Sequence, residues 1–278
     1  MKHHQSTALV GMFAVGLGWA TLSPSFVLAQ STALEVNPIQ FTPPPLPDRG
    51  RPSGRQRGGA SRGSCGLADG QSSLTALAPA TQVSLSTAES AADESELLNY
   101  ESVFSLTTEA HPSFWFYVPY RLDADTALEF VFQDESGETL YQTRFVAEQD
   151  SPSIVQVSLP ESYPPLAVDA PYQWYFMVHC DLAAASEPPY VKGWIARTDI
   201  NPGLQAQLAA TTVESASLYA AHGIWQDALT VLGERYREDP QNVAISNGWA
   251  SLLESVGLGE LSAEPMADCC VASELAAE

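Results

Sequence analysis

The sequence has few positive charges, few cysteines and, after its first residues, no long apolar run. It holds 12 Lys and Arg against 33 Asp and Glu, which gives a formal net charge of −21. Such a surface repels nucleic acid and anionic lipid, so we do not expect the folded part to bind nucleic acid. The absence of a later apolar segment long enough to span a bilayer predicts a mature chain without a transmembrane helix.

The short motifs that identify common enzymes are also absent. The sequence contains no G-x-S-x-G elbow, no H-E-x-x-H helix, no phosphate-binding loop and no dinucleotide fingerprint. Its 4 cysteines show no C-x-x-C spacing and therefore do not predict a zinc site. We predict no catalytic residue, no metal and no cofactor, and we expect a protein that is not an enzyme.

Residues 1–29 have the pattern of a signal peptide. Lys2 precedes an apolar run of about 15 residues from Ala8 to Leu22, shorter than the roughly 20 residues that a membrane anchor would need. Val27-Leu28-Ala29 offers the small-residue pattern of a cleavage site, so cleavage is predicted after Ala29. The mature protein is expected in the periplasm or outside the cell.

Residues 30–63 predict a disordered linker, because proline, arginine and glycine dominate them and cannot build a core. The second half carries five arginines: Arg49, Arg51, Arg55, Arg57 and Arg62. An alternative is a basic arm that touches an anionic wall polymer or the acidic face of the protein itself. After this segment, only 6 basic residues stand against 31 acidic ones.

Residues 64–200 predict an antiparallel β-sandwich of the immunoglobulin or fibronectin-III type, because short apolar or alternating runs are separated by Pro, Gly and Asp turns. The clearest hairpin joins strands at 126–133 and 139–146 through a turn at 134–138. Tyr172 occupies the place of a tyrosine corner, whose hydroxyl bonds back to the backbone near Leu166 or Val168. Residues 86–106, with many acidic residues, are interpreted as a surface insertion.

The periodicity becomes helical after Asn201. Helices are predicted at 203–222, 224–238 and 242–256, within a helical tail at 203–262 that is followed by a disordered C-terminus at 263–278. Gly223, Trp225, Ala228, Leu232 and Pro240 have the offsets of the second helix of a tetratricopeptide repeat. The tail is therefore predicted to be tetratricopeptide-like and to pack against the sandwich or on itself.

The even number of cysteines predicts disulfides in an oxidising compartment. Cys65 opens the predicted globular part and Cys180 ends a predicted core strand, so a Cys65–Cys180 bridge is the preferred pairing. Cys269 and Cys270 are adjacent, and a direct bond between them would be strained.

Two sets of side chains are candidates for function. His111, beside Glu109, and His179, beside Cys180 and Asp181, could serve a hydrolase of an unfamiliar kind, although a structural role is the simpler interpretation of both. The outward aromatic residues of the predicted strands could form a surface that stacks on sugar rings or receives a partner, unless the helical tail covers them: Trp115, Tyr117, Tyr175 and Trp194.

Several segments resemble one known family. They are Gly63-Ser64-Cys65, Leu74 to Pro79, His111 to Pro119, Gly193-Trp194-Ile195, Leu218-Tyr219-Ala220 and Gly223 to Leu229. They resemble the domain-of-unknown-function family 928 of exported cyanobacterial proteins, over about Arg57 to Pro265. The resemblance implies export, a cyanobacterial source and strands followed by helices, and it implies no activity.

These observations favour an exported, non-catalytic module that binds a protein or an envelope polymer. The alternatives are the hydrolase that uses His111 or His179, and a structural, acidic component of the envelope with the Arg-rich arm as its tether.

Overall fold

A computed structural model describes residues 38–46, 53–58, 73–86, 97–122, 126–146, 152–180, 187–210 and 214–267. All of these belong to one unit, Val36–Glu278. The predicted signal peptide, Cys65, Cys269 and Cys270 lie outside the described residues.

The strands form two sheets. The larger has six strands in the order β2 (Ala80–Ser86), β3 (Leu97–Thr107), β9 (Tyr190–Arg197), β8 (Pro171–His179), β5 (Ala127–Gln133) and β6 (Thr139–Val146). The smaller has the order β1 (Thr75–Ala76), β4 (Ser113–Val118) and β7 (Ser153–Ser158). Neighbouring strands are antiparallel, except that β3 runs parallel to β9.

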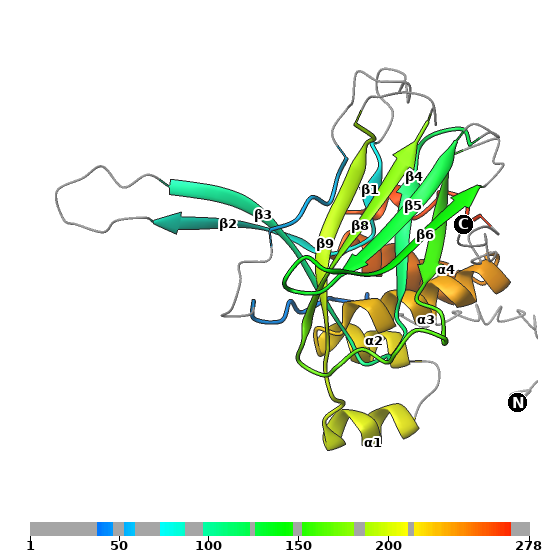
Figure 1. The fold of residues 1–278 in the computed structure, drawn as a ribbon. Coiled ribbons are helices and arrows are strands. Elements are labelled where there is room, and N and C mark those ends of the chain that lie inside the picture. The colour runs from blue at the N-terminus through cyan, green and yellow to red at the C-terminus, as the bar shows by residue number, and fades with distance from the viewer. Residues whose placement is uncertain are drawn as a thin grey trace, which may run out of the picture. The chain divides into compact units, whose positions relative to one another are not determined.

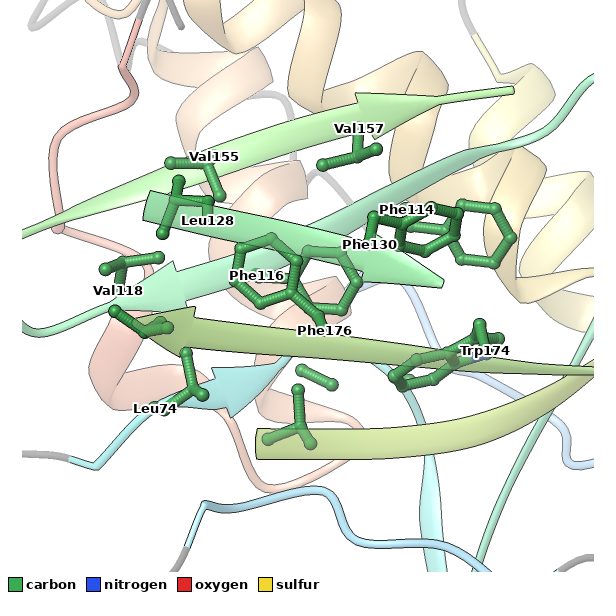
Figure 2. Close-up of a cluster of buried hydrophobic side chains, with 14 of the residues drawn as sticks. Leu74, Phe114, Phe116, Val118, Leu128, Phe130, Val155, Val157, Trp174 and Phe176 are labelled. Carbon is green, nitrogen blue, oxygen red and sulfur yellow. The ribbon is translucent and has the colours of Figure 1, made fainter. Parts of the chain in front are cut away.

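An aromatic core fills the space between the sheets (Figure 2). Phe116 of β4 stacks on Phe176 of β8 with ring centroids 4.0 Å apart, and Trp174 packs beside them. Side chains alternate along β8, with Trp174, Phe176 and Val178 buried, because successive residues of a strand point to opposite faces. The predicted hairpin of β5 and β6 is confirmed. So is the predicted bond between the Tyr172 hydroxyl and the backbone, because this hydroxyl accepts a 3.1 Å bond from the Ala167 amide.

The helices follow the strands: α1 (Pro202–Ala210), α2 (Ser215–Ala221), α3 (Trp225–Glu238) and α4 (Val243–Glu254). The single helix predicted at 203–222 is thus two elements. In Figure 1, α2, α3 and α4 lie on one side of the sheets. A second hydrophobic cluster joins them to the outer face of the smaller sheet, where Trp115, Tyr117 and Ile154 are buried.

Parts of the predicted linker belong to this fold. Ile39 and Phe41 are buried beneath the helices, and the Phe41 ring meets Trp225 edge-on. Residues 53–58 run as an extended segment that bridges the two sheets, since Arg55 pairs with Lys192 of β9 and Arg57 with Thr75 of β1. Gly54 permits the approach, because a Cβ there would lie 2.5 Å from the Val103 Cβ. The prediction of a disordered linker is wrong for these two stretches, whose apolar side chains and backbone groups find partners in the core and the sheets.

Two further boundaries differ from the sequence interpretation. Residues 97–106, predicted as part of an acidic insertion, belong to the long strand β3, whose first part pairs with β2 in a ribbon that extends away from the other strands in Figure 1. Met266, predicted in a disordered tail, pairs with Ile154, and the Ala267 amide donates to the Ile154 carbonyl.

The fold class is mainly β, with two sheets and a few C-terminal helices. Among the described residues, no helix has the length and apolarity to cross a membrane.

Candidate functional site

A pocket of about 290 Å³ opens where the end of β3 and the turn before β4 meet α2 and α3. The end of β3 contributes Thr107, and the turn contributes Glu109 and His111. The helices contribute Tyr219, Gln226, Asp227, Thr230, Val231 and Glu234.

The spacing of side chains on α3 explains why this helix lines the pocket. Trp225, Ala228, Leu229 and Leu232 are buried and hold one face of α3 on the smaller sheet. The lining residues Asp227, Thr230, Val231 and Glu234 recur at intervals of three and four, so they form a stripe along a neighbouring face.

A close contact between α3 and β4 fixes the position of the helix. Gly233 lies against the Trp115 ring, and a Cβ at this position would be 2.6 Å from the Trp115 Cη2. The Trp115 Nε1 donates a 3.2 Å hydrogen bond to the Thr230 hydroxyl. An aromatic residue of the strand thus sets the depth at which α3 rests on the sheet.

Asp227 is the most buried charged group of the pocket, with 4% of its surface exposed. The Thr107 hydroxyl donates a 2.6 Å hydrogen bond to its Oδ1. The Thr108 amide donates a 3.0 Å bond to Oδ2, and the Thr108 hydroxyl donates a second bond to the same oxygen. These donors tie the first turn of α3 to the end of β3.

Burial dominates the electrostatics of Asp227. It raises the pKa of this carboxyl from 3.8 to about 6, against the hydrogen bonds from Thr107 and Thr108, which lower it. The nearby Glu109 adds to the rise. Burial, Asp227 and Glu109 together raise the pKa of the Tyr219 hydroxyl. The pocket therefore resists further negative charge and favours a positive one.

The pocket is rich in hydrogen-bond acceptors. Glu109, Asp227 and Glu234 supply carboxylates, and none of the lining residues is Lys or Arg. Gln226 is 3% exposed, and its Oε1 has no hydrogen-bond partner within the described structure. No group of three or more His, Cys, Asp or Glu among the described residues has the geometry of a metal site. The acceptors suit a cation that carries several N–H donors.

His111 lines this pocket and is hydrogen-bonded to a neighbouring loop. Its Nε2 donates a 2.7 Å hydrogen bond to the Tyr163 carbonyl, since a carbonyl can only accept. The Leu166 amide donates to the Ala110 carbonyl, and the Leu159 amide donates to the Pro112 carbonyl. These contacts support the structural interpretation of His111, although the residue also reaches the pocket.

His179 lies away from the pocket, on the outer face of the larger sheet. Its Nε2 lies 2.6 Å from the Glu129 Oε2, and Gln142 and Arg144 donate to Glu129 Oε1. Burial raises the pKa of Glu129, but the hydrogen bonds from Gln142, His179 and Arg144 outweigh it and lower the pKa. The neighbouring Cys180 is disulfide-bonded and so offers no thiolate to His179. Its predicted partner Cys65 lies outside the described residues.

The four outward aromatic residues do not form one surface. Trp115 and Tyr117 are 2% and 4% exposed beneath the helices, so the prediction of a binding surface is wrong for these two. Tyr175 and Trp194 are half-buried on the larger sheet. The difference arises because Trp115 and Tyr117 belong to the smaller sheet, which the helices cover.

Sequence reasoning missed Asp227, Gln226 and Glu234 as parts of a site. A signal was present, because Gln226 and Asp227 interrupt the apolar run Ile224 to Leu229, and Asp227 shares a helical stripe with Glu234. What the sequence could not supply was the opposite wall, since Thr107 is 120 residues from Asp227.

Comparison with known proteins gives one family. The family model described as Domain of Unknown Function (DUF928) matches residues 57–266, and none of the curated proteins compared with the chain matches it. The matched span includes both walls of the pocket, with the segments at 111–119 and 223–229 that carry the resemblance. The chain therefore belongs to the DUF928 family.

Proposed function

We propose that the protein is an exported, non-catalytic binding module whose pocket takes a lysine or arginine side chain of a protein partner. The observation that carries the proposal is the set of acceptors around one cavity: Glu109, Asp227, Glu234 and the unpartnered Gln226 Oε1. A guanidinium group offers five N–H donors in a planar fork and satisfies several such acceptors at once.

Binding suits these side chains better than catalysis does. The oxygens of Asp227 already accept hydrogen bonds from Thr107 and Thr108, and the Nε2 of His111 is engaged with Tyr163. Groups held in this way are poorly placed to exchange protons with a substrate. An acceptor cage needs only to be rigid and oriented toward its ligand.

The pocket variants Glu109→Gln and Glu234→Gln test the proposal against a pair of short labelled peptides. One peptide contains a single arginine, and the other contains citrulline, which has nearly the same shape without the charge. We expect the full chain to bind the arginine peptide at least about tenfold more tightly, and each variant to lose about three- to tenfold, because a charge-assisted hydrogen bond is removed. Fluorescence anisotropy measures both.

Glu238→Gln is the matched control, since it removes the same charge from α3 outside the pocket. Equal binding of the arginine and citrulline peptides would refute a cation site. Tighter binding of a glucosamine oligomer than of the arginine peptide would instead assign the pocket to an envelope polymer that carries amino groups.

We also infer finer features of the fold. The tyrosine corner at Tyr172 supports a sandwich of the immunoglobulin or fibronectin-III type. The turn at Gly223, with φ of 78°, and the buried Ala220 and Ala228 support a tetratricopeptide-like pairing of α2 and α3. An experimental structure in which α2 and α3 do not pack as an antiparallel pair would contradict the second inference.

A further inference from the structure

The outer face of the larger sheet carries three neighbouring aromatic residues. Tyr175 of β8 and Tyr190 of β9 have ring centroids 6.4 Å apart, and Trp194 of β9 faces Gln173 of β8 in the register of the pair. All three rings are half-buried. They alternate with the core residues Trp174, Val191 and Ile195, so they point away from the aromatic core.

Cations accompany these rings. The Arg55 guanidinium lies 4.5 Å from the Tyr190 ring centroid, and the Lys192 ammonium lies 5.9 Å from that of Tyr175. Glu129, the acidic residue of the same face in β5, is bonded to Arg144 and His179. Among the described side chains of this face, Arg144 and His179 thus partner Glu129, and Arg55 and Lys192 are the cations beside the rings, on a chain whose net charge is −21.

Polar side chains with planar groups surround the aromatic residues. The Tyr175 hydroxyl donates a 3.0 Å hydrogen bond to the Gln173 Oε1, which fixes the direction of both side chains. Across β5, Gln142 and Arg144 are exposed but donate to Glu129, so the donors closest to the rings are the Gln173 amide and the Arg55 guanidinium. Rings that provide flat apolar area, flanked by amide and guanidinium donors, match a sugar, which has an apolar ring face and hydroxyls at its rim.

We propose that this face binds an acidic polysaccharide. Sugar rings lie against Tyr175, Tyr190 and Trp194, and the carboxylate or sulfate groups of the polymer contact Arg55 and Lys192. Charge complementarity selects an anionic polymer, because Arg55 and Lys192 lie together on a chain whose net charge of −21 otherwise repels polyanions. The aromatic trio selects sugar over an acidic peptide, since a polycarboxylate without rings would use only the two cations.

The proposed site is distinct from the acidic pocket and does not rest on it. The pocket is lined by the β3–β4 turn, α2 and α3, whereas this face is formed by β5, β6, β8, β9 and the segment at 53–58. Variants of the pocket should leave polysaccharide binding unchanged, so the two proposals can fail separately.

Affinity measurements with the full chain test the proposal. The probes are alginate, a polymer of uronic acids; dextran, a neutral polysaccharide; and poly-glutamate, a polyanion without sugar rings. We expect alginate to bind, and dextran and poly-glutamate to bind at least about tenfold more weakly. Tyr175→Ala and Tyr190→Ala should each weaken alginate binding by about tenfold, because a ring contact is lost.

Two charge variants separate stacking from electrostatics. Lys192→Gln should weaken alginate binding by about threefold at low salt and less at high salt, because exposed charges are screened. Arg235→Gln removes one positive charge from α3 in the helical layer and should change nothing. Tyr175→Phe retains the ring and should retain most of the binding, which guards against misfolding of the alanine variants.

Poly-glutamate binding as tight as alginate binding would overturn the proposal in favour of an acidic peptide. Tight dextran binding would remove the role of the cations. Unchanged alginate binding in folded Tyr175→Ala and Tyr190→Ala proteins would remove the role of the aromatic residues.

Discussion

Asp227 carries its carboxyl group where little water reaches it, at 4% exposure and with donors from Thr107 and Thr108 around it. Its pKa of about 6 lies above the value of 3.8 for a free side chain. Between these two values the folded protein binds a proton that the unfolded chain has released. The contribution of this group to stability is therefore complete below about pH 4 and is lost as the pH rises through 6.

Asp227→Asn should remove this dependence. We expect the free energy of unfolding of the parent protein to lose on the order of 3 kcal/mol from this group between pH 4 and pH 7. The Asn variant should lack that slope, although it is less stable at low pH because an amide cannot accept from all the donors of Thr107 and Thr108. Urea denaturation over a pH series measures the difference, with Asp199→Asn as an exposed control. If the free energies of unfolding of the parent and the Asn variant changed with pH in the same way, the raised pKa of Asp227 would be contradicted.

The same titration connects folding to the proposed function. Ionised Asp227 costs stability but attracts a cation, so a ligand with a guanidinium group offsets the cost when it binds. The pocket is thus expected to bind its ligand more tightly at pH 7 than at pH 5.

Helices α3 and α4 differ in what their glycines permit. Gly233 of α3 faces the rigid Trp115 ring, whereas Gly248 of α4 would place a Cβ 3.2 Å from the Leu232 Cδ2, the end of a flexible side chain. The contact at Gly233 sets how closely α3, which carries Asp227 and Glu234, rests on the sheet. At Gly233, an alanine would therefore gain helix propensity but would clash with the Trp115 ring, so the two effects on stability oppose each other.

Two alanine substitutions separate these effects. Gly233→Ala should destabilise the protein by about 1–3 kcal/mol, because overpacking against Trp115 outweighs the gain in helix propensity. Gly248→Ala should be neutral or stabilising by up to about 1 kcal/mol, since Leu232 can move aside. Chemical denaturation compares the two. A stabilised Gly233→Ala protein would show that α3 does not rest on the Trp115 ring as closely as described.

For the whole molecule, the disulfide at Cys180 bears both on the fold and on the cellular compartment in which the protein is expected. Cys180 is disulfide-bonded and follows β8, and such bonds persist outside the cytoplasm. A partner at Cys65 would close a long loop that begins before β1.

Peptide mass mapping of the exported protein should find Cys65 joined to Cys180 and Gln30 as the first residue. Cys65→Ser should lower the free energy of unfolding by roughly 4–5 kcal/mol, less any strain released, because a long loop is no longer closed in the unfolded chain. A Cys180 peptide joined to Cys269 or Cys270 would refute the pairing, and an intact residue 1 would refute cleavage.

Local pattern was enough to define much of this protein. The alternation in β7 and β8, the turn between β5 and β6, and the bond of the Tyr172 hydroxyl to the backbone depend on residues a few positions apart, so sequence reasoning placed them correctly. The change from strands to helices after Asn201 was equally local.

Only the tertiary structure decided what depends on distant partners. Residues 53–58 look like a solvated linker because they hold no apolar run, yet their backbone pairs with β9 and β1 far along the chain. Trp115 and Trp194 were both expected to point outward from their strands, but Trp115 is buried beneath the helices, whereas Trp194 is half-buried on the larger sheet. The pocket itself joins Thr107 to Asp227. The sequence alone established periodicity, charge and the family resemblance, because these are properties of neighbouring residues. The fold alone determined which acceptors and which aromatic rings share a surface, because that depends on how sheets and helices stack.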